Sequence, residues 1–274
     1  MNANCKTLVL PLALLLAGLV STQVAAQEYK EDYNAALAAA KAQQYPEARA
    51  KFAAAAEGAD EAGDDGISRQ ARSVAAKIDY KLGNAALKGD NFEQALGYYQ
   101  AGTAIFPAYI KNRYGQGLAL KKMGRMEEAL GAFREVSEAS GDRKTSLAAA
   151  KAIREHFYFQ ASSAVSRTNP TALDADRAFA ALTSLEEYNL DPDANYHYYQ
   201  AEAHRIKGDA SASAAAADEA LALHNGSKSD KAKIWFVKAQ ALVSLGDVDA
   251  AKAAFTNADF GSYRQLVKHY LETL

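Results

Sequence analysis

The chain has 274 residues, a formal net charge of −2 and a single cysteine, Cys5. This near-neutral balance lacks the surplus of lysine and arginine that replaces the counterions of nucleic acid, so we predict no nucleic-acid partner. With one cysteine the chain can form no internal disulfide and no thiolate cluster for a metal, so its stability must come from packing.

The first 26 residues have the pattern of an export signal. Lys6 is their only charged residue, Leu8–Val20 is an almost unbroken apolar run, and Val24–Ala26 precedes the expected cleavage before Gln27. The run is too short for a comfortable membrane span and no other run of that length follows, so we predict no direct membrane span. We expect segment 1–26 to export the chain to the periplasm, with secretion or peripheral attachment to the outer membrane as alternatives.

Residues 27–274 are rich in helix formers, and an aromatic residue followed three positions later by Ala or Gly recurs along them. Each occurrence predicts the first helix of a helical hairpin, and the prolines fall where the helical patterns break. The six pairs are Tyr33 with Ala36, Tyr80 with Gly83, Tyr114 with Gly117, Tyr158 with Ala161, Tyr198 with Ala201, and Phe236 with Ala239.

Each first helix is followed by turn residues and by a second pattern, in which a large apolar residue comes four positions after a small one. Two antiparallel helices approach closely only where a small side chain of one faces a large side chain of the other. A lone hairpin leaves an apolar face that the next hairpin covers, which predicts a stack. The second-helix pairs are Ala48 with Phe52, Ala95 with Tyr99, Ala129 with Phe133, Ala178 with Leu182, Ala251 with Phe255, and the weaker Ser213 with Ala217.

The segment Lys77–Pro107 matches the segment that follows it at a period of 34 residues. Its Leu82, Gly83, Ala95, Tyr99 and Pro107 resemble the signature of the tetratricopeptide-repeat (TPR) family, with Gly102 where Ala is usual. Residues 231–258 resemble the signature as well, with Trp235 at the place of the family's early tryptophan. The first-helix aromatics are 47, 34, 44, 40 and 38 residues apart, so several repeats are longer than the family's period.

This resemblance implies an all-α fold, an α-solenoid of about six TPR-like helical hairpins with a C-terminal capping helix. The signal segment, 1–26, precedes the solenoid, 27–274. The expected repeats lie near 28–57, 67–107, 108–141, 145–190, 191–225 and 229–260, and the capping helix covers 262–274.

The sequence contains no complete catalytic or metal-binding motif. Gly115–Gly117 begins like a dinucleotide-binding loop, but Leu120 replaces the third glycine and no strand is expected before it. His197 and His204 are two helical turns apart, too far to share a metal without ligands from elsewhere. We therefore predict that the chain is not an enzyme and has no cofactor and no metal site.

The feature that we single out for binding is a lysine three residues before the recurring aromatic, because this spacing puts the pair on one helix face. Lys88 and Lys122 extend the face, which lines the concave groove in the family. Asn84 matches the asparagine of the family's carboxylate clamps, but Tyr80 stands where the clamp has lysine, so we predict no chaperone-tail binding. The expected partner-binding residues are Lys30, Tyr33, Lys77, Tyr80, Asn84, Lys88, Lys111, Tyr114, Lys122, Tyr198, Lys233 and Phe236.

These residues suggest that the first three repeats form a basic groove with an aromatic floor, suited to an acidic or C-terminal segment of a protein partner. The competing interpretation makes the tyrosines core residues and the lysines solvated helix surface. The resemblance implies a non-enzymatic interaction scaffold of the periplasm or cell envelope. A soluble carrier or regulator that binds a small ligand in the groove is the alternative, an enzyme is a remote one, and the sequence predicts no oligomeric state.

Overall fold

The computed structural model describes residues 28–274, and every regular element among them is helical. The expected signal segment, 1–26, lies outside the described residues. The chain divides into two compact units: the N-terminal unit ends at Ala149, and the C-terminal unit spans Ala150–Leu274, so the division falls inside helix α7. The sequence alone predicts a single array over 27–274.

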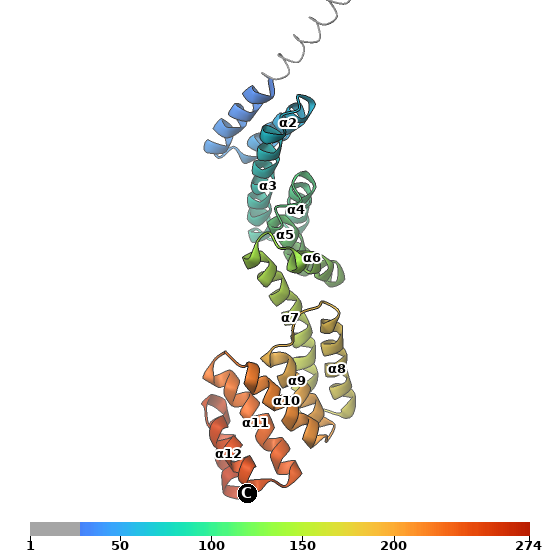
Figure 1. Ribbon diagram of the computed structural model, residues 1–274, viewed down its shortest axis with the longest axis vertical. Helices are drawn as coiled ribbons and strands as arrows, with labels where there is room; N and C mark the ends of the chain where they lie inside the picture. Colours follow the sequence, from blue (N-terminus) through green and yellow to red (C-terminus); the bar gives the residue numbers. More distant parts are fainter. Residues whose placement is uncertain (1–27) are drawn as a thin grey trace, which may run out of the picture. The chain divides into compact units, whose positions relative to one another are not determined.

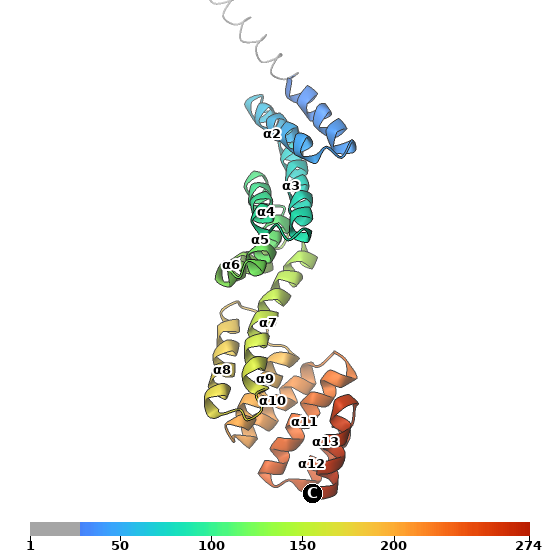
Figure 2. The same ribbon diagram turned by 180° about the vertical axis from the view of Figure 1, so that it is seen from behind.

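In the N-terminal unit, helices that follow one another in sequence pack against each other, and α3 also contacts α5 (Figures 1 and 2). The first helices of successive hairpins are thus neighbours, as a stack of hairpins requires. The elements are the helical residues 28–41, α2 (Tyr45–Glu61), α3 (Asp65–Lys88), α4 (Phe92–Ile105), α5 (Lys111–Lys122) and α6 (Met126–Glu138), and α7 (Arg143–Val165) starts in this unit.

The C-terminal unit repeats this arrangement, with α9 in contact with α11. The chain ends with a 3-10 turn and a helix whose Val267 is buried against Phe236 and Phe255, which is the expected capping helix. The elements are α8 (Ala172–Glu186), α9 (Ala194–Ile206), α10 (Ala210–Leu223), α11 (Lys228–Leu245), α12 (Val248–Ala258), the turn Gly261–Tyr263, and α13 (Arg264–Thr273).

Glycines let the aromatic rings of the second helices enter the stack. Tyr99 of α4 is fully buried, and a Cβ atom added to Gly83 of α3 would lie 2.5 Å from its Cε1 atom. A Cβ atom on Gly115 of α5 would clash with the same ring, and one on Gly117 would lie 2.5 Å from Cε1 of Phe133. Gly115 and Gly117, which resemble the start of a dinucleotide-binding motif in the sequence, therefore allow close helix packing.

A buried asparagine explains one departure from the family signature. Asn112 of α5 is fully buried, and its Nδ2 group donates a hydrogen bond of 2.9 Å to the carbonyl oxygen of Ala76 in α3. A Cβ atom at residue 102 would collide with this side chain. Gly102 thus replaces the usual alanine because Asn112 occupies the space.

The turns use the residues that the sequence pattern picks out. Gly208 and Gly246 have φ of 78° and 79°, a left-handed conformation that glycine adopts without strain. The next residues, Asp209 and Asp247, accept hydrogen bonds from the backbone N–H groups of Ala212 and Ala250 and so cap α10 and α12. These helical hairpins, with small residues facing large ones, confirm the predicted fold class.

Candidate functional site

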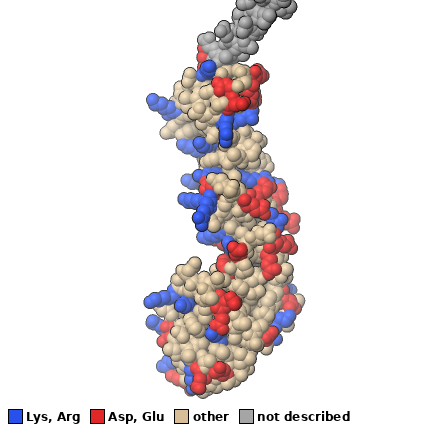
Figure 3. All heavy atoms as spheres, viewed as in Figure 1, with Lys and Arg blue, Asp and Glu red and all other residues tan. Residues whose placement is uncertain are grey.

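The charges of the N-terminal unit are divided between first and second helices. The first helices α3 and α5 together carry nine basic and two acidic residues. The second helices α2, α4 and α6 carry three basic and nine acidic residues. Figure 3 shows lysines and arginines gathered along one side of this unit and acidic residues mainly along the other. The first helices therefore carry a surplus of positive charge, part of which pairs with the second helices, as in Arg72 with Asp60 and Arg113 with Glu135.

Three of the predicted lysines form what we call the lysine surface: Lys77, Lys88 and Lys122. All three are exposed, and none makes an ion pair with another described residue. Lys88 and Lys122 are 34 residues apart, at equal positions in the contacting helices α3 and α5. This surface is available to an anionic partner.

Two other predicted lysines, Lys111 and Lys30, have charged or aromatic neighbours within the chain. The Nζ atom of Lys111 lies 3.4 Å from the carboxylate of Asp142, and its hydrogen bond to this carboxylate raises the pKa of Lys111. Lys30 is exposed, and its Nζ atom lies 5.5 Å from the ring centroid of its neighbour Tyr29. The charge of Lys111 is therefore partly offset, whereas that of Lys30 has no ion-pair partner among the described residues.

Four of the six recurring aromatics pack against an aromatic residue of their own second helix, whereas Tyr158 and Tyr198 contact Tyr199 of α9. Tyr33, Tyr80 and Tyr114 are half-buried, whereas Phe236 is only 8% exposed. The rings thus fill the hairpin interface, and only the tyrosines keep an exposed part for a partner. The ring centroids are 5.5 Å apart for Tyr33 and Phe52, 6.1 Å for Tyr80 and Tyr99, 5.6 Å for Tyr114 and Phe133, and 5.6 Å for Phe236 and Phe255.

Asn84 is half-buried beside the lysine surface. Its Oδ1 atom accepts a hydrogen bond of 2.7 Å from the hydroxyl group of Tyr99. Burial raises the pKa of Tyr99, so this hydroxyl stays protonated and can donate. The Nδ2 group of Asn84 has no hydrogen-bond partner among the described residues and remains a donor for a carbonyl or carboxylate oxygen.

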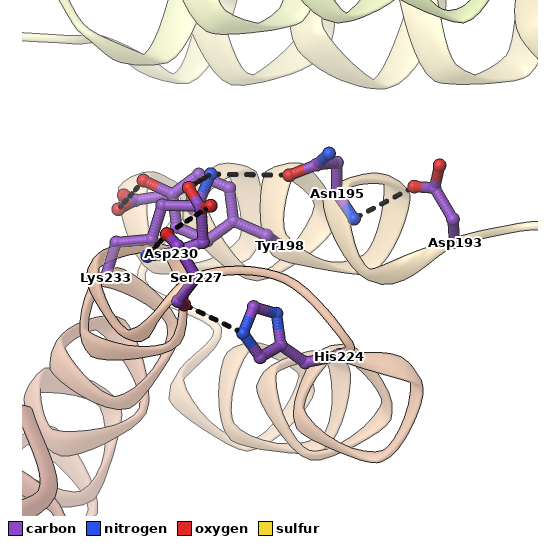
Figure 4. A network of polar contacts seen from close by, with 8 residues as sticks. Asp193, Asn195, Tyr198, His224, Ser227, Asp230 and Lys233 are labelled. Atoms are coloured by element: carbon purple, nitrogen blue, oxygen red, sulfur yellow. Dashed lines mark hydrogen bonds and ion pairs between the residues drawn. The ribbon is translucent and has the colours of Figure 1, made fainter. Parts of the chain in front are cut away.

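In the C-terminal unit, the predicted pair Tyr198 and Lys233 belongs to a network of polar contacts (Figure 4). The Nζ atom of Lys233 lies 4.7 Å from the ring centroid of Tyr198, 3.3 Å from Oδ1 of Asn195 and 3.5 Å from Oδ1 of Asp230. Asn195 and Lys233 each stand three residues before the recurring aromatic, in the neighbouring first helices α9 and α11. This position therefore joins two repeats, and the charge of Lys233 is balanced within the chain.

The network continues through the ends of these helices. Ser227 donates a hydrogen bond of 2.7 Å to Asp230, which lowers the pKa of that carboxyl group. Asp193 accepts hydrogen bonds of 2.9 Å from the backbone of Asn195 and 2.7 Å from the hydroxyl of Tyr158. The predicted residues of this unit thus have structural partners, unlike the lysine surface.

Two cavities lie away from the predicted residues. One, of about 440 Å³, lies between α2, α3 and α4 and is lined by Leu82, Tyr98 and a charged pair in which Nε of Arg49 is 3.2 Å from Oδ1 of Asp79. Asp79 is 1% exposed, and burial raises its pKa while Arg49 opposes that shift. The other, of about 430 Å³, lies between α7 and α8 of the C-terminal unit.

Two kinds of feature are absent from the described residues. Residues 28–274 contain no group of three or more histidine, cysteine, aspartate or glutamate side chains that could hold a metal ion. None of the described helices is both long and apolar enough to span a membrane.

No protein-family model matches the chain, and no curated protein matches it. Among solved structures, a thermophilic TPR protein of Thermus thermophilus is 17% identical, with a TM-score of 0.30, over 89% of this chain and 97% of that one. A TPR protein of Parabacteroides merdae is 12% identical, with a TM-score of 0.32, over 90% and 98% of the two chains. The TPR domain of P58(IPK) is 15% identical, with a TM-score of 0.33, over 92% and 66%.

The TPR-type fold rests on the packing of the chain's own helices. Glycine meets aromatic rings at Gly83, Gly115 and Gly117, and successive first helices are in contact in both units. Folds of this type commonly mediate protein–protein interactions.

Proposed function

We propose that this TPR-type chain is a non-enzymatic scaffold that binds an acidic segment of a partner protein on the lysine surface of its N-terminal unit. The observation that carries the proposal is the division of charge, with nine basic residues on α3 and α5 against nine acidic residues on the second helices. Lys77, Lys88 and Lys122 have no ion pair among the described residues, so a partner need not displace an internal carboxylate from any of them.

The expected binding is of modest affinity and depends on several contacts together. A single exposed ion pair contributes about 0–1 kcal/mol, because water screens it and the side chains lose freedom. The Nδ2 group of Asn84 and the exposed parts of Tyr80 and Tyr114 add directional and apolar contacts beside the lysines. Charge then mainly speeds the encounter and orients the acidic segment.

We further propose that the chain meets its partner in the periplasm or at the cell envelope. The support is the pattern of residues 1–26, with one lysine followed by an apolar run and small residues. Fractionation of cells that express the full chain tests this: recovery of an unprocessed chain with the cytoplasm contradicts it, and recovery outside the cells or with the outer membrane selects the alternatives.

The partner-binding proposal is tested by crosslinking in cells from a photoreactive residue at Lys81, which is exposed between Lys77 and Lys88. We expect capture of a defined protein, and a loss of about tenfold when Lys77, Lys88 and Lys122 are changed to Glu, since three reversed charges alter binding by about 1–3 kcal/mol. The control variant changes three exposed lysines elsewhere, Lys144, Lys228 and Lys231, to Glu. Equal capture by the two variants would refute a role of the lysine surface.

A second candidate function, the carriage of a small ligand, is favoured by the cavity between α2, α3 and α4. Its volume of about 440 Å³ is within the range of ligand pockets. A Cβ atom at Gly97 in its wall, or at the equivalent Gly131 one repeat on, would meet nothing within 4 Å. If the cavity binds a ligand, Gly97→Leu abolishes the rise in melting temperature that the ligand causes, and Gly131→Leu does not.

A further inference from the structure

The cavity between α7 and α8 has the most exposed large apolar side chain among the described residues at its edge. Phe159 of α7 is 74% exposed, although burial of a phenyl ring is strongly favourable. The floor beside it consists of small residues, including Ala164, Ala180 and Ala181. The cavity thus has small side chains in its wall and an uncovered phenyl ring at its edge.

Two arginines line the same cavity and share one carboxylate. Arg167 and Arg177 each bring an Nη1 atom to 3.1 Å from Oδ1 of Asp174, whose side chain is 6% exposed. The other oxygen, Oδ2, accepts hydrogen bonds from the backbone N–H and the hydroxyl of Thr171, at 3.0 and 2.8 Å. Asp174 is thus fully used in holding the two arginines together.

This arrangement leaves an excess of positive charge at the cavity. The hydrogen bonds from Thr171, assisted by the two guanidinium groups, hold the pKa of Asp174 below its usual value, so it carries one negative charge against two positive ones. The Nε and Nη2 groups of Arg167 and Arg177 have no partner among the described residues, and both side chains are more than half exposed. Guanidinium groups bind carboxylates with two parallel hydrogen bonds, so a second carboxylate suits this end of the cavity.

We propose that this cavity binds a segment of a partner protein in which a large apolar side chain stands next to an aspartate or glutamate. The apolar side chain packs on the alanines against Phe159, and the acidic side chain binds the free N–H groups of Arg167 and Arg177. The volume of about 430 Å³ suits one or two side chains. The site uses neither the lysine surface nor the N-terminal unit, so it does not rest on the function proposed above.

The test measures, by fluorescence anisotropy, the affinity of labelled hexapeptides for a chain that lacks the first 26 residues. One panel carries Leu, Phe or Trp between Asp or Glu residues, and the matched panel carries Asn and Gln instead of the acids. We expect the best acidic peptide to bind at least tenfold more tightly than its amide counterpart. We also expect Phe159→Gln and Arg167→Gln each to weaken it about tenfold, and Arg167→Lys, which keeps the charge but loses the fork, to weaken it less.

Two control variants match these changes outside the cavity. Leu173 is 60% exposed on α8 and does not line the cavity, so Leu173→Gln removes a similar exposed apolar group, and Arg264→Gln removes an exposed arginine. Both should bind like the unchanged chain, and circular dichroism must show that every variant is folded.

Several results overturn the proposal: equal binding of acidic and amide peptides, binding by no peptide in the panel, or unchanged binding by folded Phe159→Gln and Arg167→Gln. A different outcome is that one variant with Lys77, Lys88 and Lys122 all changed to Glu loses binding, while the cavity variants retain it. The peptide then binds the lysine surface. That outcome refutes the cavity site and leaves the function proposed above intact.

Discussion

At the scale of single residues, the contact of Asn112 with Gly102 gives a sharp prediction. A Cβ atom on residue 102 would overlap the amide of Asn112, which is held by its hydrogen bond to the carbonyl oxygen of Ala76. We expect Gly102→Ala to lower the free energy of unfolding by about 1–3 kcal/mol, because overpacking outweighs the helix propensity of alanine. Urea unfolding measures the change.

The partner variant makes the cause of this loss testable. Asn112→Ala alone removes the side-chain hydrogen bond to the carbonyl oxygen of Ala76 and the buried volume of the amide, and should also destabilise, by about 1–3 kcal/mol. Because Asn112→Ala also removes the overlap, the double variant should be more stable than the sum of the two single changes implies. Strict additivity would contradict the contact.

Asp64 predicts a specific dependence of stability on pH. Its carboxylate accepts hydrogen bonds of 3.0 Å from the backbone N–H of Ile67 and 2.9 Å from the hydroxyl of Tyr29, and these bonds, with Lys30 nearby, lower the pKa of Asp64. Its contribution is therefore complete above the pKa of an unfolded aspartate, about 3.9, and is lost as pH falls through the lower folded-state pKa.

The variant Asp64→Asn keeps an acceptor oxygen but cannot titrate. Its melting temperature should lie below that of the unchanged chain at pH 7, and the gap should close as pH falls from about 4 to 2. Asp65→Asn, at an exposed neighbouring residue with no hydrogen-bond partner among the described residues, is the control. A gap that stays constant with pH would show that the charge of Asp64 contributes nothing.

At the scale of helices, glycines at different positions predict opposite effects of the same substitution. A Cβ atom on Gly115 of α5 would clash with the ring of Tyr99, whereas one on Gly131 of α6 would meet nothing within 4 Å. Gly115→Ala should therefore destabilise by about 1–3 kcal/mol through overpacking, and Gly131→Ala should stabilise by about 0.5–1 kcal/mol through helix propensity. Thermal unfolding of the two variants side by side distinguishes these effects, and a stabilising Gly115→Ala would contradict the packing of Tyr99 against α5.

The helices themselves follow from local signals, so the sequence predicts them well. Each recurring aromatic with its small residue marks a first helix, and turns such as Gly208–Asp209 combine a left-handed glycine with a cap. The role of Tyr80 and Tyr114 in the hairpin interface agrees with the competing interpretation of these residues as core. The difference in charge between first and second helices can also be read from the sequence, once the helices are assigned and their charges are counted separately.

Features that depend on how helices meet could not be predicted in this way. The pairing of Lys111 with Asp142, 31 residues apart, depends on the path of the chain between α5 and α7. To predict the cavity beside Phe159, one would need to know how the backbones of α7 and α8 lie relative to each other. The position of Arg167, which follows the end of α7, would be needed as well. A sequence period or motif does not give the distances between side chains of different helices, so the sequence did not single out Phe159, Arg167 or Arg177.

At the scale of the whole molecule, the two units offer surfaces of different chemistry. The N-terminal unit has lysines without ion pairs along α3 and α5, while Lys233, which corresponds to Lys77, pairs with Asp230 and donates a hydrogen bond to Asn195. The C-terminal unit instead presents the cavity with Phe159 and two arginines. The recurring pairs of aromatic and small residues predict the repeats of both units, but these differences arise from single residues that vary between repeats.

The formal net charge of −2 predicts weak overall repulsion of an acidic partner, so binding on the lysine surface must come from local charge. Salt screens charges over about 8 Å at physiological ionic strength, which leaves the nearest lysines dominant. We expect Lys77→Gln, Lys88→Gln and Lys122→Gln together to slow association of the partner captured by crosslinking about tenfold at low salt. The effect should shrink as salt is raised in stopped-flow experiments.

The comparison variant neutralises three exposed acidic residues of the second helices, Glu57, Glu127 and Glu138, as glutamines, which changes the net charge by the same amount with the opposite sign. If the lysine surface binds locally, this variant should change the association rate by less than about twofold, because these helices carry the opposite side of the charge division. Equal and opposite changes in rate for the two variants would mean that net charge alone governs association. The acidic partner would then have no preferred surface on the N-terminal unit.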